Sequence, residues 1–307
     1  MTPAFIAVDW GTSNFRAFLA DAEARVLAER RSAAGLRALE AAAFPHYCRE
    51  QLSDWLHDAG GEGALPIYLA GMVGARSGWA EAAQLELPLS PETLAAHLTA
   101  APGLANAWLV PGGKVVTAEH VDVMRGEEVQ AFGGLALTGR DSGLFCLPGT
   151  HSKWIRAEGG RLVDFTTLVT GELYHAVRFH TLLGEPVPPE DAFDAEGFER
   201  GLAAARHPAG VLHALFEARS RYLHDGLAAG QVGSFLSGVL IGSEIAAMDH
   251  LLAPANGVTL IGSPALAARY RQALGGRRDL VVTTLDSDVA SLAGIARLHA
   301  RRRAASA

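Results

Sequence analysis

The chain has 307 residues, of which 49% are hydrophobic and 19% charged, and its formal net charge at pH 7 is −7. This composition is that of an ordinary globular protein, and the negative charge argues against an extended nucleic-acid-binding surface. The length favours two domains, because single hydrophobic cores stop growing at roughly 250–300 residues.

The N-terminal residues lack the positive segment and apolar stretch of a secretory signal. No apolar run reaches the roughly 20 residues that cross a bilayer. The only two cysteines, Cys48 and Cys146, follow no disulfide pattern, which is typical of a reducing compartment. We therefore expect a soluble cytoplasmic protein that binds neither a membrane nor nucleic acid. The oligomeric state stays open, with a homodimer as one alternative.

The first half of the chain alternates apolar runs with turns and one long amphipathic segment. Apolar residues recur near helical spacing from Leu39 to Leu56, and Gly60-Gly61 would end that helix. The predicted elements are strands over 4–9, 14–20 and 25–30, a helix over 38–59, and strands over 66–71 and 108–111.

The second half repeats this order, with three strands first and helices later. Three prolines within residues 184–189 cannot continue a helix and predict a connection. The predicted elements are strands over 144–148, 152–157 and 161–168, helices over 171–183, 190–206, 210–229 and 233–252, a strand over 258–261, a helix over 264–274, a strand over 280–285 and a helix over 288–303. The whole pattern predicts an α/β protein in two lobes.

A short turn occurs twice, each time between two strand-like runs. It reads Asp-Trp-Gly-Thr-Ser-Asn-Phe-Arg at residues 9–16 and Pro-Gly-Thr-His-Ser-Lys-Trp at residues 148–154. Glycine lets the backbone approach a phosphate, successive N–H groups form an anion-binding concavity, and the hydroxyl and amide side chains add donors. Either turn alone fits an ordinary β-turn. Their pairing indicates two related half-molecules that bind one nucleotide.

Asp9 ends the first strand directly before its turn. A carboxylate in this position can hold Mg²⁺, directly or through water, because magnesium prefers oxygen ligands. Arg16 could neutralise phosphate or bind a carboxylate.

Six stretches together resemble the 2-dehydro-3-deoxygalactonokinase family of the sugar kinase/Hsp70/actin superfamily. They are residues 8–16, 71–79, 122–128, 147–154, 170–173 and 237–244. The resemblance implies a two-lobed actin-like ATPase (ribonuclease H-like) fold, with a mixed sheet and flanking helices in each lobe. It places an N-terminal lobe at 1–120, rejoined by the last helix at 288–307, and a C-terminal lobe at 121–287.

The same resemblance implies that ATP, with Mg²⁺, phosphorylates 2-dehydro-3-deoxy-D-galactonate at the 6-hydroxyl. Both turns would bind phosphates, Gly171 would leave room for the nucleotide, and a small-residue turn at 262–263 would pack against adenosine. The expected nucleotide- or phosphate-binding residues are Gly11, Thr12, Ser13, Asn14, Gly149, Thr150, His151, Ser152, Lys153, Gly171, Gly262 and Ser263. Lys153 could instead lie on an exposed strand face, and His151 could simply cap its turn.

Transfer to an alcohol needs a carboxylate that takes the hydroxyl proton. Superfamily sugar kinases carry Gly-Asp-Gln at a helix start, and the similar stretch here places Glu127 at the aspartate position. Glu128 and Asp122 remain alternatives. Acids at a helix start can also serve only to complement the macrodipole.

The substrate of this family carries a carboxylate, for which a planar arginine is the natural partner. Arg76, Arg125 and Arg16 are the candidates. Met72 and Trp79 could line the sugar pocket or pack in the core. Kinases for another sugar acid or amino sugar, and a non-metabolic ATPase switch, are the alternative functions.

Overall fold

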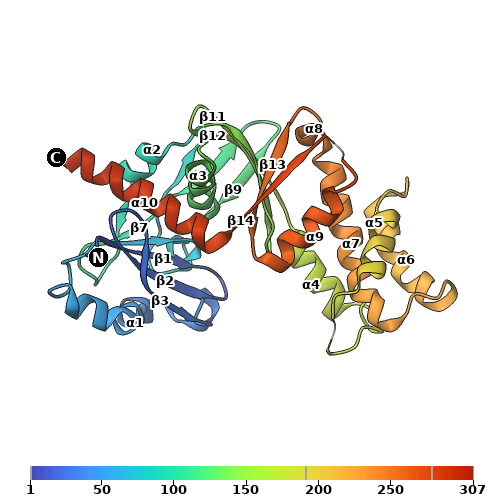
Figure 1. Cartoon of the computed structure of the whole chain (residues 1–307). Helices are drawn as coiled ribbons and strands as arrows, with labels where there is room; N and C mark the ends of the chain where they lie inside the picture. The colour runs from blue at the N-terminus through green and yellow to red at the C-terminus, as the bar shows by residue number, and fades with distance from the viewer. Residues whose placement is uncertain (1, 191, 278, 307) are drawn as a thin grey trace. The chain divides into compact units, whose positions relative to one another are not determined.

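The computed structural model describes residues 2–190, 192–277 and 279–306 (Figure 1). The chain forms two compact units. The first comprises Met1–Phe145, Ile155–Thr166 and Leu285–Ala307, and the second comprises Cys146–Trp154 and Thr167–Thr284. This division assigns residues 121–145, 155–166 and 285–287 to the first unit, whereas the sequence places them in the expected C-terminal lobe.

A six-stranded mixed sheet forms the centre of the first unit, in the order β3-β2-β1-β4-β7-β6. Strands β1, β2 and β3 are antiparallel neighbours, β1, β4 and β7 run parallel, and β6 returns antiparallel to β7. Their bounds are β1 (Phe5–Trp10), β2 (Phe15–Ala20), β3 (Val26–Ser32), β4 (Ile67–Ala70), β6 (Thr99–Ala100) and β7 (Ala107–Leu109). Strand β1 is apolar at nearly every position because both faces of this central strand are buried.

Helix α1 (Phe44–Asp58) packs its apolar face into the core of this unit. Phe44, Cys48, Leu52 and Trp55 lie on that face at helical spacing, and all are buried. The predicted helix over 38–59 is wrong at its start, where the chain forms two 3₁₀ turns, η1 (Leu36–Ala38) and η2 (Ala41–Ala43). Pro45 explains the difference, since it has no N–H to bond a carbonyl of a preceding turn.

A small sheet and a short helix of the first unit were not predicted from the sequence. Strands β5 (Gln84–Glu86), β8 (Gly112–Val116) and β9 (Val121–Met124) form a three-stranded sheet, and α2 (Pro91–Ala96) follows β5. Helices α3 (Glu127–Thr138) and α10 (Ser287–Ser306) pack against each other. A Cβ on Gly133 would lie 1.8 Å from the Ala290 oxygen, and one on Gly294 would lie 2.0 Å from the Val129 oxygen, so only glycine allows this approach.

A second, five-stranded sheet has the order β12-β11-β10-β13-β14. Its strands are β10 (Gly143–Leu147), β11 (Ser152–Glu158), β12 (Arg161–Leu168), β13 (Gly257–Gly262) and β14 (Val281–Asp286). The division between the two units falls within β10, β11 and β12. The order third-second-first-fourth is that of the first sheet, which is what the doubled turn in the sequence predicts.

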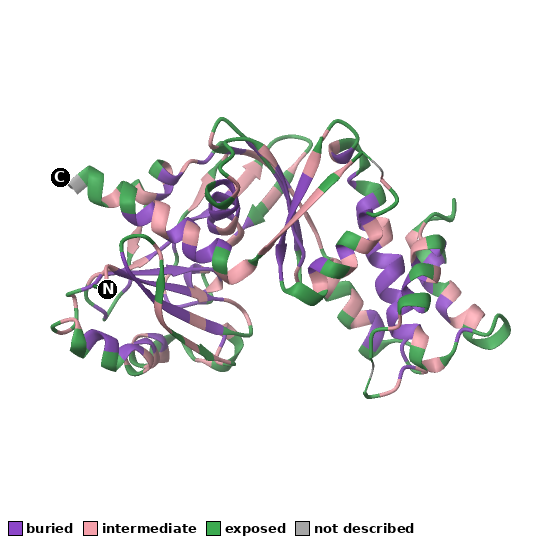
Figure 2. Ribbon diagram, viewed as in Figure 1, coloured by how far each residue is buried: buried purple, intermediate pink, exposed green. Residues whose placement is uncertain are grey.

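The second unit also contains a helical bundle, in which α7 is the buried member (Figure 2). Close contact between α5 and α7 depends on small residues, because a Cβ on Gly201 would lie 2.1 Å from the Phe235 oxygen. The predicted helix over 233–252 is divided at Met248. The helices are α4 (Thr170–His180), α5 (Ala195–Ala204), α6 (Val211–His224), α7 (Ala229–Ala247), α8 (Asp249–Leu252) and α9 (Pro264–Leu274).

Both cysteines, Cys48 and Cys146, are free thiols in buried positions. Across residues 2–190, 192–277 and 279–306, no helix has the length and apolar character to cross a bilayer.

Candidate active site

Three chain segments meet at one point of the first unit. Gly71, directly after β4, has φ +93°, and a Cβ there would lie 2.9 Å from the Trp10 oxygen. Gly126, before α3, has φ +103°, and a Cβ there would lie 3.0 Å from the Gly71 Cα. Only glycine tolerates both the backbone angle and the approach. The end of β1, the end of β4 and the start of α3 therefore form one site.

Asp9 belongs to a cluster of two acids and two arginines at this site. It pairs in register with Arg16 on β2, whose Nη1 lies 3.7 Å from the Asp9 Oδ2. The same Nη1 donates to Asp288 Oδ1 at 2.7 Å, and Arg31 Nη1 lies 2.6 Å from Asp288 Oδ2. Arg16 is therefore held mainly by Asp288, at the start of α10, and only secondarily by Asp9.

The pKa of Asp9 is raised to about 6. Burial is the main cause; the charge of Arg16 opposes it, and the charges of Asp288 and Glu127 add to it. At neutral pH Asp9 is thus an ionised carboxylate whose charge is incompletely compensated. Such an oxygen ligand, with further carboxylates nearby, fits Mg²⁺.

The two glutamates at the start of α3 differ in exposure. Glu128 is fully buried, both of its carboxyl oxygens accept the Gly126 N–H at 2.9 and 2.8 Å, and burial raises its pKa to about 8. Glu127 is half-buried, accepts the Arg125 N–H at 3.0 Å, and lies near enough to Asp9 to raise the pKa of that carboxyl. Glu128 therefore caps the helix, whereas Glu127 faces the Asp9 site.

Asp122, the third acid considered, lies on β9. Its Oδ1 accepts the Val123 N–H at 2.7 Å, and its Oδ2 lies 3.6 Å from His120 Nε2. These contacts engage the Asp122 carboxylate at the three-stranded sheet.

Arg125 brings a guanidinium to the loop after β4. Its Nη2 donates to the Ala82 oxygen at 2.8 Å, whereas Nη1 is buried and has no hydrogen-bond partner among the described residues. A Cβ on Gly74 would lie 3.0 Å from that Nη1, which places it against the loop. Burial lowers the Arg125 pKa. Arg125 as a whole is half-buried, so its guanidinium is a candidate partner for a carboxylate.

The other substrate-binding candidates lie on or beside the same loop. Arg76 is exposed, and Met72 is half-buried in the 3₁₀ turn η3 (Met72–Gly74). Trp79 is 8% exposed, belongs to the core and donates its Nε1–H to the Pro102 oxygen at 2.9 Å. The indole of Trp79 therefore packs in the core, and its role in sugar binding stays a prediction.

The first turn is closed by its own backbone and by the segment after β3. The Gly11 N–H donates to the Asn14 oxygen at 2.9 Å, and the Arg37 N–H donates to the Thr12 oxygen at 3.2 Å. Ser13 and Asn14 are exposed, so their polar groups can reach a ligand.

The second turn, in the second unit, lies under the start of α4. A Cβ on Gly171 would lie 2.3 Å from the Gly149 oxygen, and the Glu172 N–H donates to the Thr150 oxygen at 2.8 Å. The His151 Nε2 and the Glu172 Oε2 lie 2.6 Å apart. Lys153 is 4% exposed, so the alternative of a lysine on an exposed strand face is wrong.

The turn at 262–263 lies beside this second turn within the second unit. Gly262 is buried, and a Cβ there would lie 3.5 Å from the Pro148 oxygen. Ser263 is exposed and its hydroxyl does not cap α9, which leaves it available to a ligand.

A buried carboxylate holds the second turn in place, and the sequence analysis assigned it no role. Glu244 on α7 accepts from Trp154 Nε1 at 2.8 Å, from the Tyr270 hydroxyl at 2.8 Å and from the Thr170 hydroxyl. Burial raises its pKa although these hydrogen bonds oppose the rise. The available signal was a single charged residue in the stretch 237–244, which is otherwise uncharged and mainly apolar or small.

The sequence model of the 2-keto-3-deoxy-galactonokinase family matches residues 9–298. The chain is 37% identical to the 2-dehydro-3-deoxygalactonokinase of Escherichia coli (strain K12) over 295 residues, which cover 96% of this chain and 97% of that protein.

Solved structures agree in fold. A crystal structure of a candidate 2-dehydro-3-deoxygalactonokinase from Sinorhizobium meliloti is 39% identical, with a TM-score of 0.83 over 98% of this chain and 96% of that chain. Component A of the (R)-2-hydroxyglutaryl-CoA dehydratase of Acidaminococcus fermentans has a TM-score of 0.57 at 14% identity, over 99% of this chain and 100% of that chain, and is similar in fold alone. The predicted actin-like α/β fold is confirmed.

Proposed function

The chain belongs to the 2-keto-3-deoxy-galactonokinase family, and on this premise we propose that it transfers the γ-phosphoryl group of ATP to the 6-hydroxyl of 2-dehydro-3-deoxy-D-galactonate. Support comes from one observation above all: the half-buried Arg125 guanidinium, one nitrogen of which has no hydrogen-bond partner among the described residues, packs against the loop that adjoins the Asp9–Glu127 site. A site that joins a carboxylate-binding group to acid–base and cation-binding groups suits a sugar acid.

Arg125 would bind the substrate carboxylate, and the exposed Arg76 lies on the loop that the Arg125 guanidinium contacts. Arg16 is the weaker candidate because Asp288 already engages its Nη1 at 2.7 Å. Met72 and Trp79 would shape the pocket from the same loop.

Glu127 would accept the proton of the attacking hydroxyl. Its partial exposure and its position beside Asp9 favour it over Glu128, which is fully buried and bonded to the Gly126 N–H. A general base must lie within hydrogen-bond reach of the proton that it removes. The fully buried carboxyl of Glu128 does not meet this condition.

Asp9 would hold Mg²⁺, directly or through water. The bound ion would neutralise charge on the β- and γ-phosphates. Residues 11–14 of the first turn and residues 149–153 of the second would contact phosphate, chiefly through the exposed Ser13, Asn14, Thr150 and His151. The Ser152 hydroxyl would support its turn instead, because it is buried and hydrogen-bonded to the Tyr270 hydroxyl at 3.0 Å. Gly171, Gly262 and Ser263 would border the nucleotide. Because it draws on cellular ATP, the enzyme is expected to act in the cytoplasm.

An assay that couples ADP release to a spectroscopic signal tests the proposal. We expect turnover with 2-dehydro-3-deoxy-D-galactonate and little with other sugar acids or amino sugars. Turnover of a different sugar, with none above background for this one, would overturn the substrate assignment. Equal ADP release without any sugar would instead favour an ATPase switch.

A further inference from the structure

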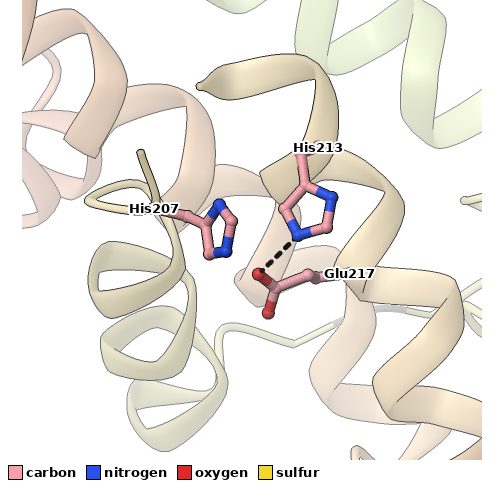
Figure 3. Close-up of side chains that lie close together, drawn as sticks. All are labelled: His207, His213 and Glu217. Atoms are coloured by element: carbon pink, nitrogen blue, oxygen red, sulfur yellow. Dashed lines mark ion pairs between the residues drawn. The ribbon is translucent and has the colours of Figure 1, made fainter. Parts of the chain in front are cut away.

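A group of metal-ligating side chains lies in the second unit, apart from every residue assigned above. His207 belongs to the connection between α5 and α6, and His213 and Glu217 lie on α6 (Figure 3). One ligand atom from each lies within 4.8 Å of the other two. It is the only such group of three among the residues that the structure describes.

Local structure explains why the three side chains meet. His213 and Glu217 are four residues apart, so they lie on one face of α6, and His213 Nε2 is 3.4 Å from Glu217 Oε1. The Gly210 N–H donates to the His207 oxygen at 2.9 Å, in a turn that leads into α6. The rings of His207 and His213 are thereby 4.2 Å apart between centroids.

Glu217 is oriented as a ligand by a neighbouring arginine. Arg221, one turn further along α6, donates to Glu217 Oε2 from Nε at 2.7 Å, and its Nη2 lies 2.6 Å from the same oxygen. The other oxygen, Oε1, is thus directed at His213 (Figure 3). Hydrogen bonds that fix a ligating carboxylate are a regular feature of metal sites.

We propose that His207, His213 and Glu217 bind a divalent transition-metal ion, Zn²⁺ in the first place. Two imidazoles and one carboxylate, with water as the fourth ligand, form a set that Zn²⁺ accepts in tetrahedral geometry. Ligand atoms around Zn²⁺ lie about 3.3 Å apart for metal–ligand distances near 2.0 Å. Both histidines are exposed, so small side-chain rotations can close the present separations.

One existing contact limits the affinity. The Ala209 N–H donates to His207 Nδ1 at 3.1 Å, so this nitrogen carries the ring's lone pair and the neutral ring carries its proton on Nε2. Figure 3 shows the ring of His207 directed toward Glu217. Binding through Nε2 moves the ring proton to Nδ1 and gives up the bond from Ala209. The loss of this hydrogen bond weakens metal binding at the site.

Calorimetric titration of the full chain with Zn²⁺, in a buffer without phosphate or nucleotide, tests this proposal. We expect a binding event that His213→Gln and Glu217→Gln each weaken by at least about 10-fold. Co²⁺ added in place of Zn²⁺ should produce the visible absorption of a tetrahedral complex, and the same variants should lose it.

The matched control is His180→Gln. His175 and His180 on α4 form another exposed pair, with ring centroids 5.6 Å apart, but they belong to no such group of three among the described residues. The control should bind Zn²⁺ like the parent chain, and the melting temperatures without metal should agree among all four proteins. No binding to the parent at millimolar Zn²⁺, or equal loss in the control, would overturn the proposal.

Discussion

At the scale of single residues, Glu127 and Glu128 are neighbours with opposite environments. One is half-buried beside Asp9, and the other is fully buried with both oxygens on one N–H group. Environment, more than residue type, decides which acid can take a proton from substrate.

Replacing Glu127 with Gln should lower kcat by about 10²-fold or more, because the variant has no carboxylate to receive the hydroxyl proton. Steady-state kinetics with both substrates measures this effect, and KM for ATP should change little. Glu128→Gln is the matched control, since an amide oxygen can still accept the Gly126 N–H. A larger loss in the control would transfer the role of base to Glu128.

The raised pKa of Asp9 leads us to expect activity that depends on pH. Its pKa of about 6 lies above the ordinary value of 3.8, so Asp9 gains a proton and loses its charge as the pH falls through 6. If Asp9 holds Mg²⁺, kcat/KM for Mg-ATP should decline below about pH 6, since this parameter reports on groups of the free enzyme. The Asp9→Asn variant should have a lower kcat/KM for Mg-ATP at every pH and should not show this decline in acid. If the variant shows the same decline, the titration belongs to another group.

We expect substitution of Arg125 to weaken binding of the sugar acid selectively. Arg125→Gln should raise KM for the sugar acid about 10-fold to 100-fold, the equivalent of losing a charge-assisted hydrogen bond, and leave KM for ATP nearly constant. Arg125→Lys keeps the charge but not the planar guanidinium, so its KM for the sugar acid should lie between those of the parent chain and Arg125→Gln. A larger effect from Arg76→Gln would move the carboxylate site to the exposed arginine.

At the scale of elements, contact between helices depends on glycines that have no conformational role. Gly294 lies within α10, where a Cβ would collide with the Val129 oxygen of α3 at 2.0 Å. Backbone atoms cannot move aside as a flexible side chain can, so the helices themselves would have to separate.

Gly294→Ala should therefore lower the free energy of unfolding by about 1–3 kcal/mol. Urea denaturation measures this change. Gly230→Ala on α7 is the matched control, because a Cβ there has no neighbour within 4 Å and alanine favours a helix. Equal destabilisation by both substitutions would contradict the close-packing argument.

Elements with continuous apolar runs, such as β1 and β4, were predicted correctly from the sequence. The strands β5 and β8 were missed because Gln-Leu-Glu and a Gly-Gly start carry little strand signal, and their pairing comes from tertiary contact. The repeated turn correctly placed two loops between adjacent strands, whose phosphate-binding role stays a prediction. No sequence pattern could show that Glu244 lies beside Trp154 and Tyr270. Such long-range contacts exist only after folding.

At the scale of the whole molecule, α10 completes the first unit through a buried histidine. His299 is 7% exposed, lies 4.9 Å from Phe5 between ring centroids, and shares a hydrogen bond with the Tyr68 hydroxyl at 3.0 Å. Burial, with Arg303 and Arg302 adding to it, lowers the His299 pKa to about 4.

This histidine should make the protein less stable in acid. Between about pH 6.5 and pH 4 the unfolded chain binds a proton at His299 and the folded chain does not, so the free energy of unfolding falls as the pH falls through this window. Urea denaturation across the window measures the slope. His299→Asn should reduce it, and His97→Asn, at an exposed position, should not. An identical slope in both variants would assign the acid sensitivity to other groups.

The discontinuity of the first unit also has a consequence for synthesis on the ribosome. Residues 167–284 of the second unit are translated before α10, the helix that carries His299 and Gly294. The core sheet of the first unit leaves the ribosome early. The surface that packs against α10 stays uncovered while more than a hundred further residues are translated. Domains generally fold as units during translation. In this protein the N-terminal half is made first, but its unit reaches the native state only after the second unit has left the ribosome.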